Sequence, residues 1–153
     1  MKHKTRLFTY TLCLILLTVP WLIADTGQIN PSLHQLARWG QETLMEMLLE
    51  NGADPSAVDI MGRTALHYGA RHPKVVAVLT KHGADPNISD RFGNTPLHLA
   101  IVEHESVRLL IEAGADVNIR NQVNRSPLDI SLRQGSSRRN RRTVELLLKA
   151  GAQ

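Results

Sequence analysis

The stretch that decides the fold is Asp90-Arg91-Phe92-Gly93-Asn94-Thr95-Pro96-Leu97-His98-Leu99-Ala100. It starts as a tight turn, because Asp at the opening and Gly at the close are residues that turn geometry favours. It continues as a helix, since Thr95 is suited to the N-cap and Pro96, at the first helical position, has no N–H to leave unpaired. The stretch therefore predicts a projecting turn followed directly by a short helix.

The same pattern recurs along the chain. Residues 59–67 repeat it closely, residues 121–129 repeat it in decayed form, and Pro31-Ser32-Leu33-His34 is a fainter copy. Each copy is followed by a Gly-Ala pair, and the glycine spacings are 31, 31 and 37 residues. These glycines are Gly52, Gly83, Gly114 and Gly151. A period of this length predicts a stack of similar structural units.

Each unit also contains a second apolar segment, which ends at its glycine. The apolar residues of these segments repeat in phase, so we expect second helices that end where a positive φ is needed. No unit has enough apolar surface to form a core alone, and each must therefore pack against a neighbour. The expected buried rows are Leu44, Met47 and Leu48; Val75, Val78 and Leu79; Val107, Leu109 and Leu110; and Val144, Leu146 and Leu147.

These units resemble ankyrin repeats, whose signature is matched outright by Thr95-Pro96-Leu97-His98-Leu99-Ala100. The resemblance covers about residues 30–153. It implies an all-α fold, an ankyrin-repeat solenoid of about four helix-turn-helix units with projecting β-turn loops. It also implies that His67 and His98 are structural and form hydrogen bonds within and between repeats. The units are expected at about 30–58, 59–89, 90–120 and 121–153.

The fourth unit is longer than the others. From the Leu of each signature to the closing Gly, the intervals are 19, 17, 17 and 23 residues. We assign the difference to the turn between the two helices, trimmed in units two and three and extended in unit four. The extra residues fall within 135–142, which is expected to be an exposed loop. A last helix over 143–150 follows, protected on one side only.

The N-terminal segment predicts export. Three cations precede the first acidic residue: Lys2, Lys4 and Arg6. An apolar stretch over 7–19 and a region that ends at Ala24 follow, and this order is typical of a signal peptide. We expect residues 1–24 to be removed and 25–153 to form a domain in the periplasm or outside the cell. The alternative is a signal anchor that is not cleaved, and 25–153 crosses the membrane in either case.

Charge and cysteine content exclude several classes of protein. The net charge is +4, but without residues 1–24 the chain has 15 basic and 14 acidic residues. A domain so close to neutral does not offer the broad basic face that nucleic-acid binding requires. The single cysteine, Cys13, lies in the leader, so the exported part can form no disulfide and depends on packing for its stability.

The chain contains histidines and aspartates, but their spacing does not match that of a catalytic or metal-binding site. His72, His82 and His104 lack the paired spacing on one helix face that a zinc site requires. Asp59 and Asp90 each open a turn that ends in glycine, which explains both as turn residues. We expect no catalytic residue, no cofactor and no metal. An enzyme that uses His72, His104 or the carboxylates is the alternative, and a deep pocket with converging groups would favour it.

The resemblance implies a non-enzymatic protein-protein interaction module. We expect a monomer that binds another protein on its concave turn-and-first-helix face. The layout is similar to that of small exported bacterial ankyrin proteins, and by this analogy the partner is an envelope enzyme or a toxin that the chain protects or inhibits. If the leader is retained, the alternative is a membrane-tethered scaffold.

The residues expected to bind the partner are side chains that the ankyrin layout places on one concave surface. Trp, Tyr and Arg are enriched at binding hot spots. At turn tips and first-helix ends they are Arg38, Trp39, Ile60, Met61, Arg63, Arg71, His72, Arg91, Phe92, Asn94, Gln122, Val123 and Arg125. The alternative for Trp39 and Tyr68 is that they cover the core end left by a missing turn in unit one.

The loop predicted in unit four adds a basic cluster to these residues. Its members are Arg138, Arg139, Arg141 and Arg142. Four cations in so short a segment can dock an acidic partner or an anionic membrane surface. The alternative is a solvated insertion without a binding role.

Overall fold

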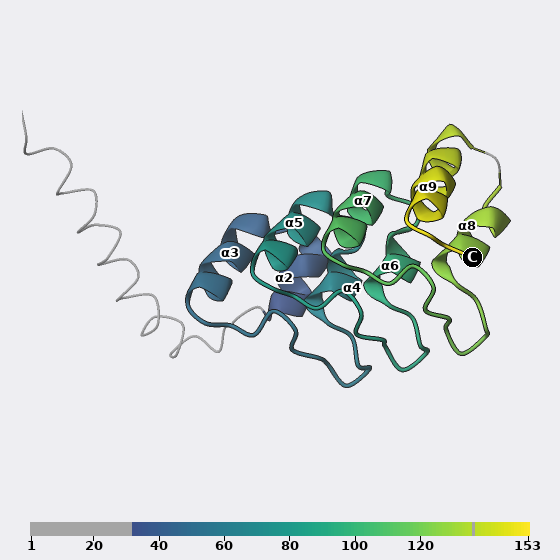
Figure 1. The fold of residues 1–153 in the computed structure, drawn as a ribbon. Coiled ribbons are helices and arrows are strands. Elements are labelled where there is room, and N and C mark those ends of the chain that lie inside the picture. Colours follow the sequence, from purple (N-terminus) through teal and green to yellow (C-terminus); the bar gives the residue numbers. More distant parts are fainter. Residues whose placement is uncertain (1–31, 136) are drawn as a thin grey trace, which may run out of the picture. The chain divides into compact units, whose positions relative to one another are not determined.

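The computed structural model describes residues 32–135 and 137–153, so the leader predicted over 1–24 lies outside the described residues. The described part consists of helix pairs, with one layer of first helices, a second layer of longer helices and turns along one edge (Figure 1). The first helices are α2 (Leu33–Trp39), α4 (Ala65–Gly69), α6 (Pro96–Ala100) and α8 (Pro127–Arg133). The second helices are α3 (Glu42–Glu50), α5 (Pro73–Lys81), α7 (His104–Glu112) and α9 (Arg138–Lys149).

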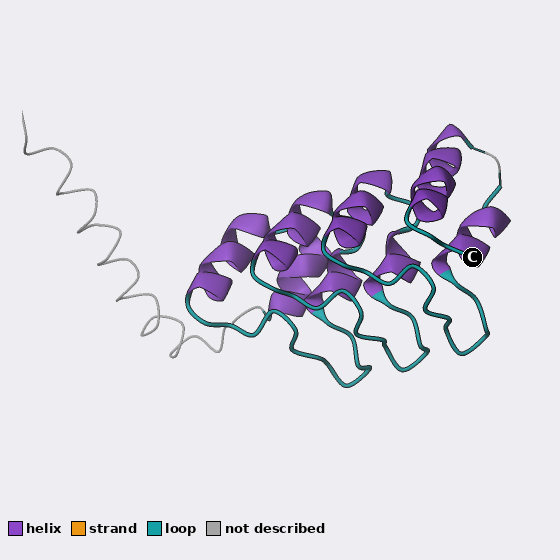
Figure 2. Ribbon diagram, viewed as in Figure 1, coloured by secondary structure: helices purple, strands orange, loops and turns teal. Residues whose placement is uncertain are grey.

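This arrangement confirms the predicted all-α solenoid of four helix pairs. Figure 2 shows only helices and loops in the described part of the chain, and the loops between pairs project together. Within the same residues, no helix combines the length and the apolar composition that crossing a membrane requires.

A repeated histidine both caps its own helix and reaches the next unit. The N–H of Thr95 donates to Nδ1 of His98 at 3.1 Å, so Nδ1 is an acceptor and the ring proton lies on Nε2. Nε2 then donates to the carbonyl of Arg125 in the following turn at 3.1 Å. His67 bonds in the same way to the carbonyl of Asn94, at 2.9 Å. The structural role predicted for both histidines is confirmed.

The fourth unit has an aspartate in the place of this histidine. Asp129 accepts hydrogen bonds from the N–H of Ser126 at 2.9 Å and from its hydroxyl at 3.0 Å, and it forms an ion pair with Arg120 at 2.8 Å. A carboxylate cannot donate to a carbonyl as the histidine ring does. Unit four therefore keeps the helix cap and does not carry the group that joins one unit to the next.

An acidic or amide residue holds each projecting turn. Oδ1 of Asp90 accepts the N–H of Phe92 at 2.9 Å and that of Asn94 at 3.0 Å. Asp59 and Asn121 repeat this arrangement in their own turns. The prediction that the aspartates are turn residues is confirmed, and main-chain hydrogen bonds of 2.9 Å join successive turn tips.

Gly93 is required where two turns approach each other. Its φ is 75°, in the left-handed region, and a Cβ there would lie 2.9 Å from the backbone nitrogen of Gln122. Only glycine satisfies both conditions without moving the backbone of the neighbouring turn.

The predicted apolar rows fill the core in units two to four and not in unit one. Leu79, Leu110 and Leu147 are fully buried, whereas Leu48, at the equivalent position, is 37% exposed. Leu44 and Met47 are also exposed, so their prediction as core residues is wrong. The reason is that an inner second helix packs against the unit before it, as α5 packs against α3, and no unit precedes α3 in the described part. Met45 and Leu49 form the core of unit one instead.

The prediction of a long loop in unit four is also wrong. Residues 138–142 are the first part of α9, and α8 ends at Arg133. The hydroxyl of Ser137 accepts the N–H of Asn140, which caps the helix at its start, Arg138, rather than at the expected residue 143. The extra length therefore lies mainly in helices, because α8 has 7 residues where α6 has 5, and α9 has 12 where α7 has 9.

Candidate functional site

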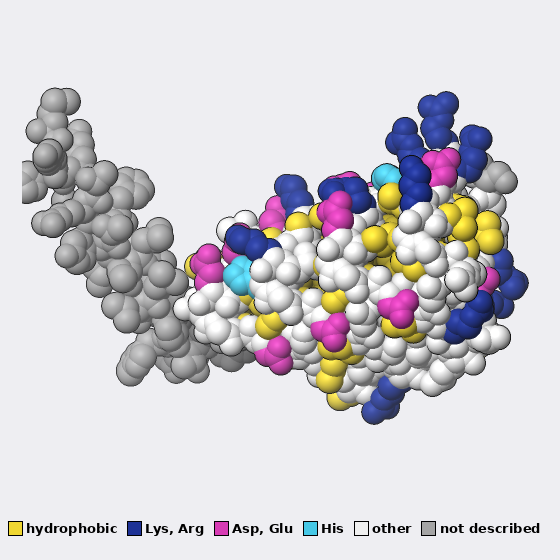
Figure 3. Space-filling model, viewed as in Figure 1, with side chains coloured by type: hydrophobic (Ala, Val, Ile, Leu, Met, Phe, Trp, Pro, Cys, Tyr) yellow, Lys and Arg dark blue, Asp and Glu magenta, His cyan; other side chains and the backbone are white. Residues whose placement is uncertain are grey.

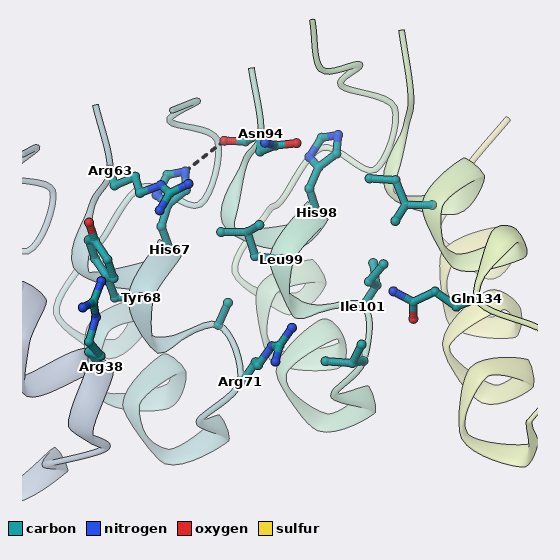
Figure 4. A pocket seen from close by; sticks show the side chains of 13 residues that line it. Arg38, Arg63, His67, Tyr68, Arg71, Asn94, His98, Leu99, Ile101 and Gln134 are labelled. Atoms are coloured by element: carbon teal, nitrogen blue, oxygen red, sulfur yellow. Dashed lines mark hydrogen bonds between the residues drawn. The ribbon is translucent and has the colours of Figure 1, made fainter. Parts of the chain in front are cut away.

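A continuous groove runs along the ends of the first helices. A hollow of about 280 Å³ beside Trp39 shares Arg38 and Tyr68 with a second hollow of about 430 Å³. The second shares Ile101, Val102 and Gln134 with a third of about 160 Å³, which extends to the start of α9. These three hollows are termed the first-helix groove, and Figure 4 shows the largest of them.

At the end of the groove formed by units one and two, Tyr68 organises two arginines. The guanidinium of Arg38 lies 4.8 Å from the centre of the Tyr68 ring, and that of Arg63 lies 5.8 Å from it (Figure 4). The hydroxyl of Tyr68 donates to Asp59 at 2.6 Å. This hydrogen bond, together with burial, raises the pKa of Tyr68. The neutral phenol is therefore held in place as a platform for the guanidinium groups.

The arginines of this end differ in their ion pairs. Arg63 donates from Nε to the carboxylate of Asp90 at 3.1 Å, and the Asp90 side chain is fully buried. Arg38 and Arg71 are exposed and form no ion pair with a carboxylate of the described residues. Two positive charges of the groove thus remain available to a ligand.

Toward units three and four the groove becomes apolar. Leu99 and Ile130 occupy the repeat position that Tyr68 holds in unit two, and Val102 occupies the position of Arg38 and Arg71. Leu99, Val102 and Ile130 are partly exposed. None of the residues that line the first-helix groove is Asp or Glu. The chemistry of the groove therefore changes along its length, from basic and aromatic to apolar.

The turn tips present large apolar side chains to solvent. Ile60 is 84% exposed, Phe92 50% and Val123 66%. Each comes from a different turn, and these turns are tied together by main-chain hydrogen bonds. The neighbouring side chains of Arg91 and Gln122 are exposed as well.

Several other predicted residues have partners within the fold. Met61 and Arg125 are partly buried, and the side-chain oxygen of Asn94 accepts a hydrogen bond from Asn121 at 2.9 Å. His72 packs against Gly40, where an added Cβ would lie 3.2 Å from Nδ1 of His72. These side chains support the turn edge and the first-helix ends.

Trp39 and Tyr68 differ in their surroundings. Trp39 is 59% exposed at the end of α2, so it does not cover the core as the alternative interpretation required. Tyr68 is partly buried and packs against the core, while one side of it lines the groove. Tyr68 therefore serves both the core and the groove surface.

The arginine cluster lies on the first turns of α9 rather than in a loop. Arg138, Arg141 and Arg142 are exposed, and Figure 3 shows basic side chains gathered at this end of α9. Arg139 belongs to the same helical turn. Cations in a first turn oppose the helix dipole, so this placement is unfavourable for the helix itself. A hollow of about 410 Å³, lined partly by Arg138 and Arg142, adjoins residues 103–105 and is separate from the first-helix groove.

Sequence reasoning missed the apolar half of the groove. The residues that line it and are absent from the predicted binding residues include Leu99, Val102, Ile130 and Gln134. The repeat itself carries the signal, because the position that is Arg in units one and two becomes Val102 in unit three. A comparison of the same position across the units finds the change.

The histidines form no metal-binding cluster in the described part of the chain. No group of three or more His, Cys, Asp or Glu side chains in residues 32–135 and 137–153 is placed to hold a metal ion. His67 and His98 line the groove, and burial lowers the pKa of both rings. His104 has a buried Nδ1 without a hydrogen-bond partner and borders the hollow beside Arg138, and His72 is the N-cap residue of α5.

A stack of helix pairs with a groove along its first helices and a row of projecting turns defines a protein-protein interaction module built from repeats. The family model for ankyrin repeats (3 copies) matches the chain over residues 14–90, 33–121 and 73–153. The chain belongs to the ankyrin repeat family. No curated protein matches the chain with significant sequence similarity.

Proposed function

We propose that the chain is a non-enzymatic module that binds one partner protein through its concave turn-and-first-helix face. The observation that carries this proposal is the row of exposed apolar side chains Ile60, Phe92 and Val123. Backbone N–H groups that donate to Oδ1 of Asp59, Asp90 and Asn121 already hold these turns, so the fold does not need apolar side chains at the tips. Exposed apolar groups aligned on one edge are characteristic of a surface that a partner covers.

The partner is proposed to be an enzyme of the cell envelope or a toxin, which the chain protects or inhibits after export. Support for export comes from the order of charged and apolar residues in 1–24. Intact-mass analysis of the protein from its native cells tests it, and the expected chain begins near Asp25 outside the cytoplasm. A chain that keeps Met1 and sediments with membranes would favour the tethered scaffold. A cytoplasmic protein that starts at Met1 would exclude both.

The binding face is tested by capture from native cells. The tagged full chain is cross-linked in the envelope, and its captured proteins are compared with those of the Ile60→Ser/Phe92→Ser/Val123→Ser variant. The matched control changes three apolar residues of similar exposure elsewhere on the surface: Leu44, Leu132 and Leu148, each to Ser.

We expect one protein to be captured by the native chain and by the control, and to be lost from the turn-tip variant. If the control loses it and the turn-tip variant keeps it, the binding face is at the ends of the stack and the proposed face is wrong. Circular dichroism of all three proteins establishes that each is folded.

A further inference from the structure

The first-helix groove is basic and aromatic at one end and apolar at the other, and this difference indicates which kind of ligand it binds. We propose that it binds a peptide segment of the partner in which acidic side chains are followed by apolar ones. The acidic side chains lie over Arg38 and Arg71, and the apolar ones over Leu99, Val102 and Ile130. This inference rests on the proposed function and names the chemistry of the bound segment.

The basic end is prepared for carboxylates. The guanidinium carbon of Arg38 lies over the Tyr68 ring, 4.8 Å from its centre, and Arg38 forms no ion pair with a carboxylate of the described residues, so its N–H groups can donate to a ligand. A planar guanidinium held in this way binds a carboxylate through two parallel hydrogen bonds. Arg71 is exposed at the same position of the next unit, so the two arginines provide one cation for each unit.

The spacing of the units sets the spacing of the acidic residues. Packed helices are separated by roughly 8–10 Å, and a peptide in the extended polyproline II conformation advances about 3.1 Å per residue and presents every third side chain on the same side. Arginines in adjacent units therefore match acidic side chains about three residues apart. Across all four units the groove extends over roughly 25–30 Å on the same helix spacing, which about eight or nine extended residues would fill.

The apolar end excludes a uniformly anionic ligand. Leu99, Val102 and Ile130 carry no charge, so phosphates of a nucleic acid that faced them would lose water there without compensation. Arg133, at the position of unit four that corresponds to Arg38 and Arg71, does not line the groove. A flat bilayer does not enter the hollows that run along the ends of the first helices. A protein segment with an acidic half and an apolar half can pair with the arginines at one end of the groove and cover the apolar side chains at the other.

The test is an unbiased selection from a random 12-residue peptide phage library against the immobilised full chain. We expect enriched peptides to have Asp or Glu about three residues apart in one half and Leu, Ile, Val or Phe in the other. Binding of the best peptide, measured by fluorescence anisotropy, is expected to weaken about tenfold or more in Arg38→Gln/Arg71→Gln. Arg71→Gln alone should weaken it as well, and this variant leaves the contact of Arg38 with Tyr68 intact.

The matched control is Lys81→Gln/Lys149→Gln, which removes the same charge from exposed positions outside the groove. It should bind the peptide within about twofold of the native chain, since charges beyond a Debye length of about 8 Å are screened at physiological salt. Equal losses in the groove variant and the control would overturn the proposal. Enrichment of basic or wholly apolar peptides, or of none, would overturn it too.

The two proposals can fail separately. If a partner is captured from cells through the turn tips and no acidic peptide is selected, protein binding remains and the groove assignment is wrong. If vesicles containing phosphatidylglycerol retain the native chain and release Arg38→Gln/Arg71→Gln, the arginines bind lipid and the peptide proposal is wrong.

Discussion

Arg63 of unit two donates from Nε to the carboxylate of Asp90 in unit three, at 3.1 Å, and joins the two units at their turns. The Asp90 side chain is fully buried, while that of Arg63 is 29% exposed. The same carboxylate accepts the N–H groups of Phe92 and Asn94 within its own turn. One side chain thus stabilises a turn and its attachment to the preceding unit.

Two substitutions of Asp90 are expected to distinguish its role in the turn from its ion pair with Arg63. Asp90→Ala leaves two turn N–H groups and Arg63 without their acceptor, and should lower the free energy of unfolding by about 2–4 kcal/mol. Asp90→Asn should cost less, because Asn121 holds the equivalent turn of unit four through its own Oδ1. Urea unfolding curves provide the comparison. Equal destabilisation by both variants would show that the ion pair, and not the turn, accounts for the effect.

The free energy of unfolding is expected to decrease as the pH is lowered, at pH values where the carboxylates are still ionised. Burial lowers the pKa of His67 and His98 below the ordinary value of 6.5, and protonation of Nδ1 would remove the acceptor of the helix cap. Since the unfolded chain binds these protons first, stability is complete above about pH 6.5 and declines as the pH falls below it. Urea midpoints between pH 7.5 and 5 measure the decline. His67→Gln/His98→Gln should be less stable at pH 7.5 and should show a smaller slope; an unchanged slope would assign the effect to other groups.

The start of α9 is expected to depend on Asn140. Its side chain is buried and bonds to the hydroxyl and the carbonyl of Ser131 and to the carbonyl of Gly135. Asn140→Ala leaves these groups without a partner and should cost about 1–3 kcal/mol. Hydrogen exchange should become faster over residues 138–142 and remain unchanged in α5. Ser137→Ala serves as a control for the cap alone, and faster exchange throughout the chain would mean that the effect is global.

Phe92→Ala is expected to affect binding more than folding. The ring is half exposed, while the turn is held by backbone groups that the substitution leaves in place. It should reduce partner affinity by at least about 1 kcal/mol, as loss of an aromatic hot-spot residue does. Phe92→Tyr retains the ring and should bind normally. If affinity is unchanged and the melting temperature drops, Phe92 is a packing residue.

The arginine cluster is expected to influence the rate of association. Changing Arg138, Arg141 and Arg142 to Ser should slow binding of an acidic partner and reduce its dependence on salt. Folding should be unimpaired, because cations in the first turn of α9 oppose the helix dipole. Stopped-flow measurements at two ionic strengths test this, and unchanged kinetics would mean that the cluster is only solvated.

The fold was predictable where local chemistry repeats. Thr95, Pro96 and His98 specify a helix start and a bond to the next unit without reference to the rest of the chain. The errors occurred where burial depends on a neighbour or on competing local signals. Leu44 and Leu48 have the periodicity of core residues, yet no described unit lies before them, and the Ser137 cap and Asn140 extended α9 into a segment whose composition suggested a loop.

The site was less predictable, because residue type indicates candidates and not their partners. Arg38, Arg63 and Arg71 look alike in the sequence, but Arg63 is paired with Asp90 and the other two have no such pair in the described part. The contribution of Leu99 and Ile130 to the groove depends on how the units stack. A charged residue can be found by its type, whereas its availability depends on the fold around it.

Because unit four has Asp129 where units two and three have histidine, additional units can be inserted before unit four more easily than after it. A duplicate of unit two or three, inserted before unit four, would bring a ring Nε2–H to meet the next carbonyl. A unit added after residue 153 would instead place its carbonyl opposite a carboxylate, and two acceptors repel. Longer versions of the protein are therefore best engineered by inserting units before unit four, and Asp129→His is the change that should permit another unit to pack directly after it.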